Sequence, residues 1–223
     1  IAAFDTQWRG DLRQRIATWL SPFVFRRQFT HVWVPGMFQF EYARRLGFPR
    51  EEILTGMYSA DTALFDAVFE PAMAAKETKY PHRILYVGRY LDYKGVLELY
   101  HAFNELSTEQ SHDWELLLVG NGPLKDELQE TKNIHFQDFV QPEDLPALAL
   151  TAGAFVLPSR RDAWGVVLHE FAAAGLPLIS TDAAGAITAF VKEGYNGFVF
   201  RRNDKDSLKS VFKDLIACSD DEL

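Results

Sequence analysis

The chain has a single cysteine, Cys218, among its 223 residues. One thiol can form neither an internal disulfide nor a cysteine-rich metal site, so the fold has to be stabilised by its apolar core. The lack of paired cysteines suits a reducing compartment, which predicts a cytoplasmic location, the cytoplasmic face of a membrane included. No stretch approaches the roughly 20 apolar residues that a membrane-spanning helix needs.

The chain also lacks an excess of basic residues, because it has 23 lysines and arginines and 31 aspartates and glutamates, which gives a net charge of -8. Broad nucleic-acid binding needs a basic surface that displaces counterions, so no nucleic-acid partner is expected and any phosphate site must be local. The G-x-S-x-G and P-loop motifs are absent, and His169-Glu170 lacks the second histidine of H-E-x-x-H. No metal site is predicted.

The composition that remains is that of a globular protein, 48% hydrophobic and 24% charged. A chain of 223 residues exceeds one typical domain and falls short of two complete α/β domains, which predicts one domain plus a fragment. Ile1 is not a start methionine, so a truncated or processed chain is expected. The polar, proline-flanked region 71–81 suggests the junction: 1–60 end a first domain, 61–81 form a linker, and 82–223 form a second domain.

From residue 82 onward, short apolar runs alternate with segments of helical period. The predicted strands are RILYVG, WELLLVG, NIHFQDF, AFVLPS, LPLIS and GFVF, and the predicted helices cover about 94–106, 123–130, 142–151, 165–174, 185–193 and 204–217. Upstream, a helix bent at Pro22 is expected within 11–29, and another over 38–46. The alternation predicts an α/β fold, a Rossmann-like parallel sheet with helices on both faces. Ligands should therefore bind in the loops at the carboxyl ends of the strands.

The loop after the first of these strands carries Arg89 and Lys94 between Gly88 and Gly95. A lysine at the start of a helix is disfavoured by the helix dipole unless an anion lies there as well. The two cations are therefore interpreted as a diphosphate clamp. A solvated loop with a turn at Gly88 is the alternative.

The next strand leads into Gly120-Asn121-Gly122-Pro123, where glycines permit close approach of a ligand. As a dinucleotide fingerprint this loop fails, because Lys125 stands where G-x-G-x-x-G needs glycine. A plain turn is the alternative.

The stretch from Pro158 to Ser180 holds two carboxylates, Asp162 before a predicted helix and Glu170 within it. The helical neighbours of Glu170 are apolar, so a buried carboxylate there would need a partner. The functional interpretation is that amides at the helix start bind phosphate while Glu170 accepts hydrogen bonds from a ribose. The alternative makes Asp162 an N-cap and leaves Glu170 facing water.

Residues 158–177, PSRRDAWGVVLHEFAAAGLP, follow the pattern P-S-x-x-E-G-F-G-x-x-x-x-E-A-x-A-x-G-x-P. This pattern resembles the family-four retaining glycosyltransferases of the GT-B fold. YVGRYLDYKG, LLLVGNGP and IHFQDFVQPEDLPAL are similar to further motifs of that family, as are YARRLGFPREEI and YSADTALF upstream. The resemblance covers about residues 31–217.

The resemblance implies that Arg89 and Lys94 hold the donor diphosphate, Glu170 the ribose, and Asp162 the sugar, with these four residues forming the catalytic set. The implied donor-binding set is Gly88, Arg89, Lys94, Gly120, Asn121, Asp138, Phe139, Val140, Ser159, Asp162, Ala163, Trp164, Gly165, Val166, Val167 and Glu170.

The sequence departs from the family pattern at four of these positions. Asp162 replaces a glutamate, Ala163 a glycine and Trp164 a phenylalanine, and Asp138 stands where glycine is common. The shorter Asp162 is expected to alter the sugar preference or weaken activity.

The implied activity is transfer of a sugar from a nucleoside diphosphate sugar to a hydroxyl acceptor, a sugar or a lipid-linked glycan, with retention of configuration. No metal or other cofactor is expected, and the expected role is in cell-surface polysaccharide or glycoconjugate synthesis. Residues 1–60 would end the acceptor-binding domain, so this chain alone should transfer poorly, and membrane contact would come through a missing N-terminal region. A catalytically silent nucleotide-binding or interaction module and a nucleotide-sugar epimerase of the same fold are the alternatives.

Overall fold

The computed structural model describes residues 1–110 and 112–223, without the side chains of residues 70, 72, 75, 77, 78 and 221. Its larger sheet is parallel throughout, in the order β6-β5-β4-β7-β8-β9. The strands are β4 (Arg83–Val87), β5 (Glu115–Val119), β6 (Ile134–Gln137), β7 (Ala154–Leu157), β8 (Leu178–Thr181) and β9 (Gly197–Phe200). Counted along the chain this is the doubly wound order 3-2-1-4-5-6, whose direction reverses between β4 and β7.

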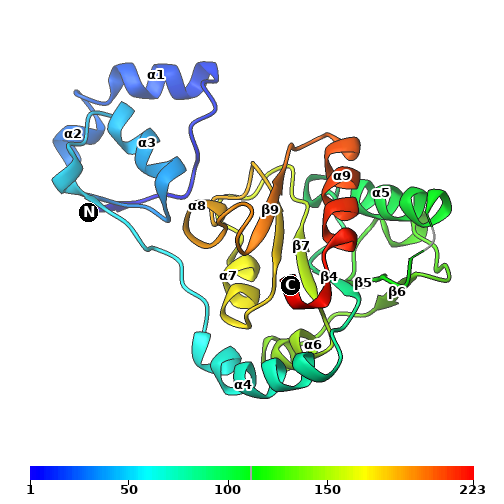
Figure 1. Ribbon diagram of the computed structural model, residues 1–223. Helices are drawn as coiled ribbons and strands as arrows, with labels where there is room; N and C mark the ends of the chain where they lie inside the picture. Colours follow the sequence, from blue (N-terminus) through cyan, green and yellow to red (C-terminus); the bar gives the residue numbers. More distant parts are fainter. Residues whose placement is uncertain (111) are drawn as a thin grey trace.

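Helices cover both faces of this sheet, as Figure 1 shows. One face carries α5 (Val96–Glu109) and α9 (Lys205–Ala217), and the other carries α4 (Thr62–Thr78), α6 (Leu145–Leu150) and α7 (Val166–Ala173). Strand residues alternate between two cores, so that Ile84 and Tyr86 pack under α5 whereas Leu85 packs toward α6 and α7. The predicted Rossmann-like α/β fold is confirmed.

A smaller unit precedes the large one and has its own apolar core around Val34, Ala43 and Phe48. Three short parallel strands form its sheet: β1 (Ala2–Ala3), β2 (Val32–Trp33) and β3 (Ile53–Leu54). Its helices are α1 (Leu12–Leu20), α2 (Phe25–Gln28) and α3 (Met37–Arg45). Pro22 separates α1 from α2, as predicted, because proline cannot continue a hydrogen-bonded helix.

Two expectations about local structure differ from what is observed. The prediction of a helix over 123–130 was wrong, because only a 3₁₀ turn, Lys125–Glu127, forms there. Its residues are exposed and only Leu124 and Leu128 turn inward, which is too little apolar surface to anchor a helix. The segment 61–81, expected as a linker, holds the 17-residue helix α4 with Pro71 inside it, and α4 packs on α6 and α7.

One short helix completes the larger unit. The helix expected over 185–193 is the four-residue α8 (Ile187–Phe190). Across the described ranges, no helix is both long and apolar enough to cross a membrane.

Candidate active site

The loops that follow β4 and β7 touch each other at the point where the strand order reverses. Gly95 has a left-handed backbone with φ of 72°, and a Cβ on it would lie 2.1 Å from the carbonyl oxygen of Pro158. The amide of Arg160 donates to the carbonyl of Tyr93 at 2.9 Å. The crevice in which doubly wound folds bind ligands is therefore built from these two loops.

Gly95 should be irreplaceable because its backbone and its surroundings both exclude a side chain. We expect Gly95→Ala to destabilise the fold by about 2–4 kcal/mol, since left-handed strain of about 1–2 kcal/mol adds to the clash with Pro158. Gly194→Ala is the matched control, because Gly194 has the same φ of 72° and nothing within 4 Å. Urea unfolding of both variants measures the difference. Equal losses would contradict the close approach of the two loops.

Lys94 and Asp162 meet across this crevice. The Lys94 Nζ lies 2.8 Å from Asp162 Oδ2, and the two side chains are 25% and 12% exposed. Ser159 Oγ donates to the same oxygen at 3.3 Å. Because an ammonium group has three N–H donors, Lys94 can hold Asp162 and a further anion together. Two residues that the sequence predicts for one site are thus in direct contact.

Arg160 joins the same two loops, and sequence reasoning missed it. Its guanidinium contacts Asp92 Oδ1 at 2.9 Å and Glu98 Oε2 at 3.2 Å. The Glu98 side chain is only 8% exposed, so this arginine compensates a nearly buried carboxylate. The partners are 68 and 62 residues away in the chain, and no spacing rule links them. Only the adjacency of β4 and β7 reveals the pair.

The amino end of α7 points its free amides toward this cluster. Gly165 precedes the helix with φ of 89°, and no side chain of the described residues caps it. The amides of Gly165, Val166 and Val167 therefore remain available to an anion, with the helix dipole favouring negative charge there. Asp162 lies beside them, since its Oδ2 would be 3.8 Å from a Cβ on Gly165.

Glu170, one turn further along α7, is half-buried, and burial raises the pKa of its carboxyl above the usual value. No described side chain forms an ion pair or hydrogen bond with this carboxylate. The carboxylate is thus partly shielded from solvent and lacks a partner among the described side chains. An uncompensated carboxylate on an apolar helix face is a candidate ligand group.

Glu170→Gln should stabilise the fold increasingly as pH rises. Because burial raises the pKa of Glu170 in the folded protein, ionising this carboxyl destabilises the fold. The stabilising contribution of the protonated carboxyl is therefore fully present below the pKa that Glu170 has in the unfolded chain, and it is lost as pH rises through its pKa in the folded protein. Glutamine removes this loss, so the variant should match the parent near pH 4.5 and exceed it at pH 7. Glu143→Gln, at an exposed position, is the control. Urea unfolding across this pH range is the measurement, and parallel curves for Glu170→Gln and the parent would contradict the assignment.

The loops after β4 and β5 also meet. A Cβ on Gly120 would lie 2.0 Å from the carbonyl oxygen of Gly88, so no larger residue fits there. Arg89 is exposed and, within the described part of the chain, its side chain has no ion-pair partner. Asn121 is exposed as well, and its side chain accepts from the amide of Gly122. Gly88, Arg89, Gly120 and Asn121 thus border the crevice on the β5 side.

The segment after β6 lies farther out, at the edge strand of the sheet. Asp138 Oδ1 forms an exposed ion pair with Lys125 at 2.6 Å. Phe139 is 66% exposed, and Val140 packs against the core. Within the part of the chain that the structure describes, none of these three residues forms a hydrogen bond or ion pair with Lys94 or Asp162, and β5 lies between β6 and the strands that lead to those two residues.

The remaining predicted residues, Ala163 and Trp164, connect the site to the smaller unit. The Gln39 side chain is fully buried and donates to the carbonyls of Asp5 and Ala163 at 2.9 and 2.6 Å. Gln7 donates to the carbonyls of Asp162 and Ala183 at 2.8 and 3.1 Å. Two amides from the smaller unit thus fix the backbone of the Asp162 loop. Neither glutamine has a sequence signal for this role, because their partners on the Asp162 loop lie more than 100 residues away.

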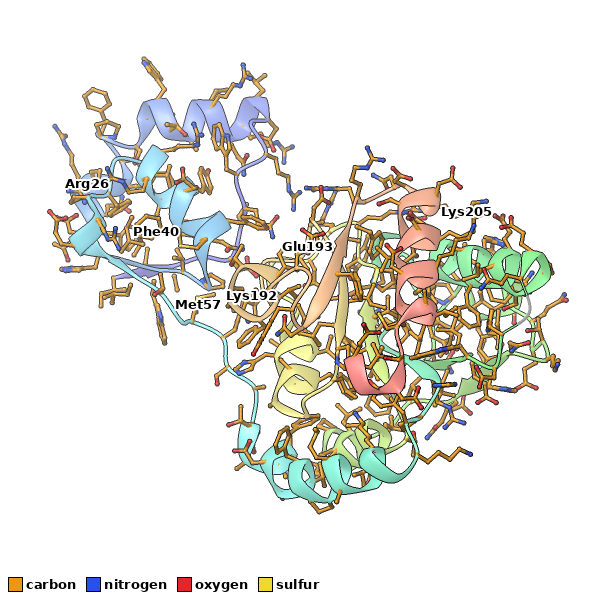
Figure 2. All side chains as sticks on the ribbon, viewed as in Figure 1. Arg26, Phe40, Met57, Lys192, Glu193 and Lys205 are labelled. Carbon is orange, nitrogen blue, oxygen red and sulfur yellow. The ribbon has the colours of Figure 1, made fainter. Side chains whose placement is uncertain are left out.

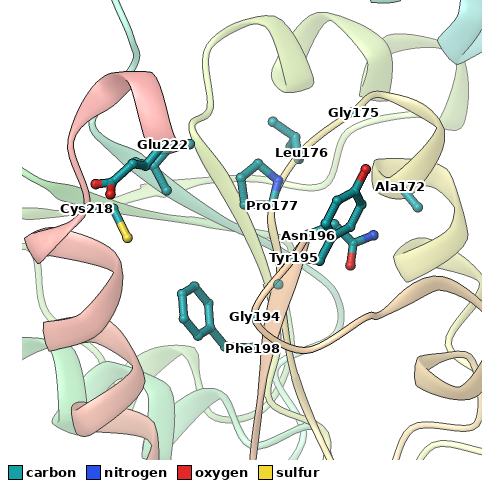
Figure 3. Close-up of a pocket in the computed structure, with 12 residues that line it drawn as sticks. Ala172, Gly175, Leu176, Pro177, Gly194, Tyr195, Asn196, Phe198, Cys218 and Glu222 are labelled. Carbon is teal, nitrogen blue, oxygen red and sulfur yellow. The ribbon is translucent and has the colours of Figure 1, made fainter.

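A separate pocket lies at the amino ends of β8 and β9, at the end of the strands opposite the crevice. Figure 3 shows Pro177, Asn196 and Phe198 lining it, with Cys218 and Glu222 after α9 on its other side. It shares no residue with the predicted site. Within the described residues, no group of three His, Cys, Asp or Glu side chains could hold a metal ion.

Comparison with known proteins adds independent findings. The family model described as glycosyl transferases group 1 matches residues 71–223. Alpha-D-kanosaminyltransferase of Streptomyces kanamyceticus is 26% identical over 195 residues, 82% of this chain and 50% of that protein. The capsular polysaccharide biosynthesis glycosyltransferase CapM of Staphylococcus aureus is 28% identical over 153 residues, 63% of this chain and 40% of that protein. The chain thus spans half or less of the length of these curated relatives.

Among solved structures, the fold is similar to that of Anabaena Alr3699/HepE in complex with UDP and glucose. The TM-score is 0.67 at 16% sequence identity, over 97% of this chain and 61% of that one.

Proposed function

This chain belongs to the group 1 glycosyl transferases, and from that premise we propose that it binds a nucleoside diphosphate sugar whose sugar the protein transfers to a hydroxyl acceptor with retention of configuration. The observation that carries the proposal is the contact between Lys94 and Asp162 beside the uncapped start of α7. A cation, free amides and a carboxylate in one crevice are suited to a sugar diphosphate.

Different residues of the crevice bind different parts of the donor, according to their chemistry. Lys94, Arg89 and the amides of 165–167 stabilise the charge that builds on the departing diphosphate, an electrostatic contribution fixed before reaction. Asp162 accepts hydrogen bonds from the sugar and orients it. Glu170 accepts hydrogen bonds from the ribose hydroxyls, which supplies the partner that its carboxylate lacks.

The base would lie toward β5 and β6. Gly120 permits close approach, and Asp138, Phe139 and Val140 follow β6 on that side of the crevice. HepE, which shares the fold, is described in complex with UDP and glucose, and this supports a nucleoside diphosphate sugar as donor. The similarity to CapM supports a role in cell-surface polysaccharide or glycoconjugate synthesis. The hydroxyl acceptor would be a sugar or a lipid-linked glycan.

Calorimetric titration of the chain with nucleoside diphosphates and their glucose and N-acetylglucosamine conjugates tests donor binding. We expect one nucleoside diphosphate to bind, with the inorganic pyrophosphate control weaker because it cannot reach Glu170. No binding by any of them would refute the proposal. Release of nucleoside diphosphate from a sugar donor would in turn exclude a catalytically silent module.

A further inference from the structure

Two glutamine side chains of the smaller unit reach the loop that carries Asp162. Gln39, in the first turn of α3, donates to the carbonyl of Ala163 at 2.6 Å. Gln7, in the segment after β1, donates to the carbonyl of Asp162 at 2.8 Å and to that of Ala183 at 3.1 Å. Figure 2 shows one end of α3 pointing toward the larger unit, on the side of α8. The smaller unit is thus hydrogen-bonded to the backbone of the predicted sugar-binding loop.

The contact around Gln39 is closely packed. The Gln39 side chain has no exposed surface, and its amide nitrogen also donates to the carbonyl of Asp5 at 2.9 Å. Gly36, which precedes α3, lies against the Trp164 ring so closely that a Cβ on this glycine would come within 2.4 Å of the ring. The Trp164 side chain is itself buried. The start of α3 is therefore fitted to the larger unit at the residues that follow Asp162.

The amide of Gln39 fits its surroundings in one orientation. Asp5 and Ala163 both present carbonyl oxygens, so Nε2 with its two hydrogens has to face them. Oε1 is then buried, and it has no hydrogen-bond partner among the described residues. A buried acceptor without a partner costs free energy, so folding alone does not favour a glutamine at this position. The side chain is suited instead to holding the Ala163 carbonyl in one direction.

A carbonyl that is held in one direction also orients the amide of the next residue. In a trans peptide the C=O and the following N–H point in opposite directions, and the described part of the chain has no cis peptide bond. Because the carbonyl of Ala163 points toward Gln39, the N–H of Trp164 points away from the smaller unit. No described residue accepts a hydrogen bond from this N–H. It is thus a further free donor, next to the amides of 165–167.

Asp162 is held by both units at once. Gln7 of the smaller unit binds its carbonyl at 2.8 Å, while Lys94 of the larger unit binds its carboxylate, also at 2.8 Å. The backbone and the side chain of Asp162 are therefore restrained separately. A carboxylate fixed in this way is in place before a ligand arrives, which is the condition for orienting a substrate.

We propose that Gln39 and Gln7 are positioning residues for the donor sugar, so that recognition of the sugar depends on the docked smaller unit. This inference rests on the proposed function of the crevice. The diphosphate meets Lys94 and the first amides of α7, whose positions come from the larger unit alone. The sugar meets Asp162 and the N–H of Trp164, whose directions are set by the two glutamines. Loss of either glutamine therefore weakens binding of the sugar and spares binding of the nucleoside diphosphate.

Titration of the chain with a nucleoside diphosphate and with its sugar conjugate tests the proposal. The quantity to compare is the affinity for the conjugate divided by the affinity for the diphosphate. Gln39→Met keeps the length of the side chain and removes its donors. It should lower this ratio about tenfold, while the affinity for the diphosphate changes by less than about twofold. Gln7→Met should lower the ratio about fivefold, and it decides the test if Gln39→Met does not fold.

Ser21→Ala is the matched control, because it removes a buried hydrogen bond inside the smaller unit. Ser21 is fully buried and donates to the carbonyl of Leu46 at 2.5 Å. This variant should unfold at a lower temperature and keep the ratio of the parent. A ratio that neither glutamine variant changes would overturn the proposal, and so would equal losses of affinity for the two ligands. A parent chain that binds no nucleoside diphosphate would instead refute the proposed function itself, so the two failures are distinguishable.

Discussion

Replacing Lys94 with alanine is expected to weaken nucleoside diphosphate binding about 100-fold, or about 2.7 kcal/mol. The ammonium lies 2.8 Å from Asp162, whose side chain is only 12% exposed. Its removal deletes the cation that meets the diphosphate and also leaves a shielded carboxylate uncompensated beside an incoming anion. Both effects act in the same direction. Calorimetric titration of the variant with the best nucleoside diphosphate gives the change in affinity.

Two further variants separate these contributions. Lys205→Ala removes a lysine that pairs with Glu105 away from the crevice, and should bind like the parent. Adding Asp162→Asn to Lys94→Ala should recover part of the affinity, since it removes the uncompensated charge. A change of less than about twofold for Lys94→Ala would show that the ammonium does not meet the diphosphate.

Trp164→Ala is expected to reduce the free energy of unfolding by about 3–5 kcal/mol, the usual cost of truncating a buried tryptophan. The ring is 5% exposed and lies between the two units, because Cβ atoms on Gly36 and Gly185 would come within 2.4 and 3.2 Å of it. It also meets Phe190 edge to face, with ring centroids 6.2 Å apart. Urea unfolding measures the loss.

The indole N–H of Trp164 is buried and has no hydrogen-bond partner among the described residues. Trp164→Phe should therefore cost much less than alanine, because it keeps the ring and removes an unsatisfied donor. Trp33→Ala, at a 42% exposed position, is the control and should cost about 1 kcal/mol or less. Similar losses for Trp164→Ala and Trp33→Ala would contradict the packing of Trp164 between the units.

The sequence predicts the larger sheet well because the apolar runs and the helical periods alternate without interruption. RILYVG, WELLLVG and AFVLPS all become buried strands, and parallel pairing then brings their following loops to one edge. That edge is sufficient to predict that Lys94 and Asp162 lie near each other. Their direct contact confirms the geometric part of that expectation, whereas their role in donor binding stays a prediction.

Features that depend on distant partners were not predictable. Arg160 is a surface-type residue by sequence, and it becomes a bridge only when β7 lies beside β4. Gln7 and Gln39 carry no local signal, although they hold the Asp162 loop from another unit. Helix α4 was missed because Pro71 and the polar residues around it predict a break, whereas packing on α6 and α7 stabilises the helix.

The most direct test of the central claim is a crystal structure of the chain with the nucleoside diphosphate that binds best in calorimetry. We expect the diphosphate in the crevice, with its oxygens within hydrogen-bond distance of Lys94 Nζ and the amides of 165–167, and the ribose at Glu170. A nucleotide bound at the amino ends of β8 and β9, in the pocket beside Pro177 and Phe198, would contradict the account.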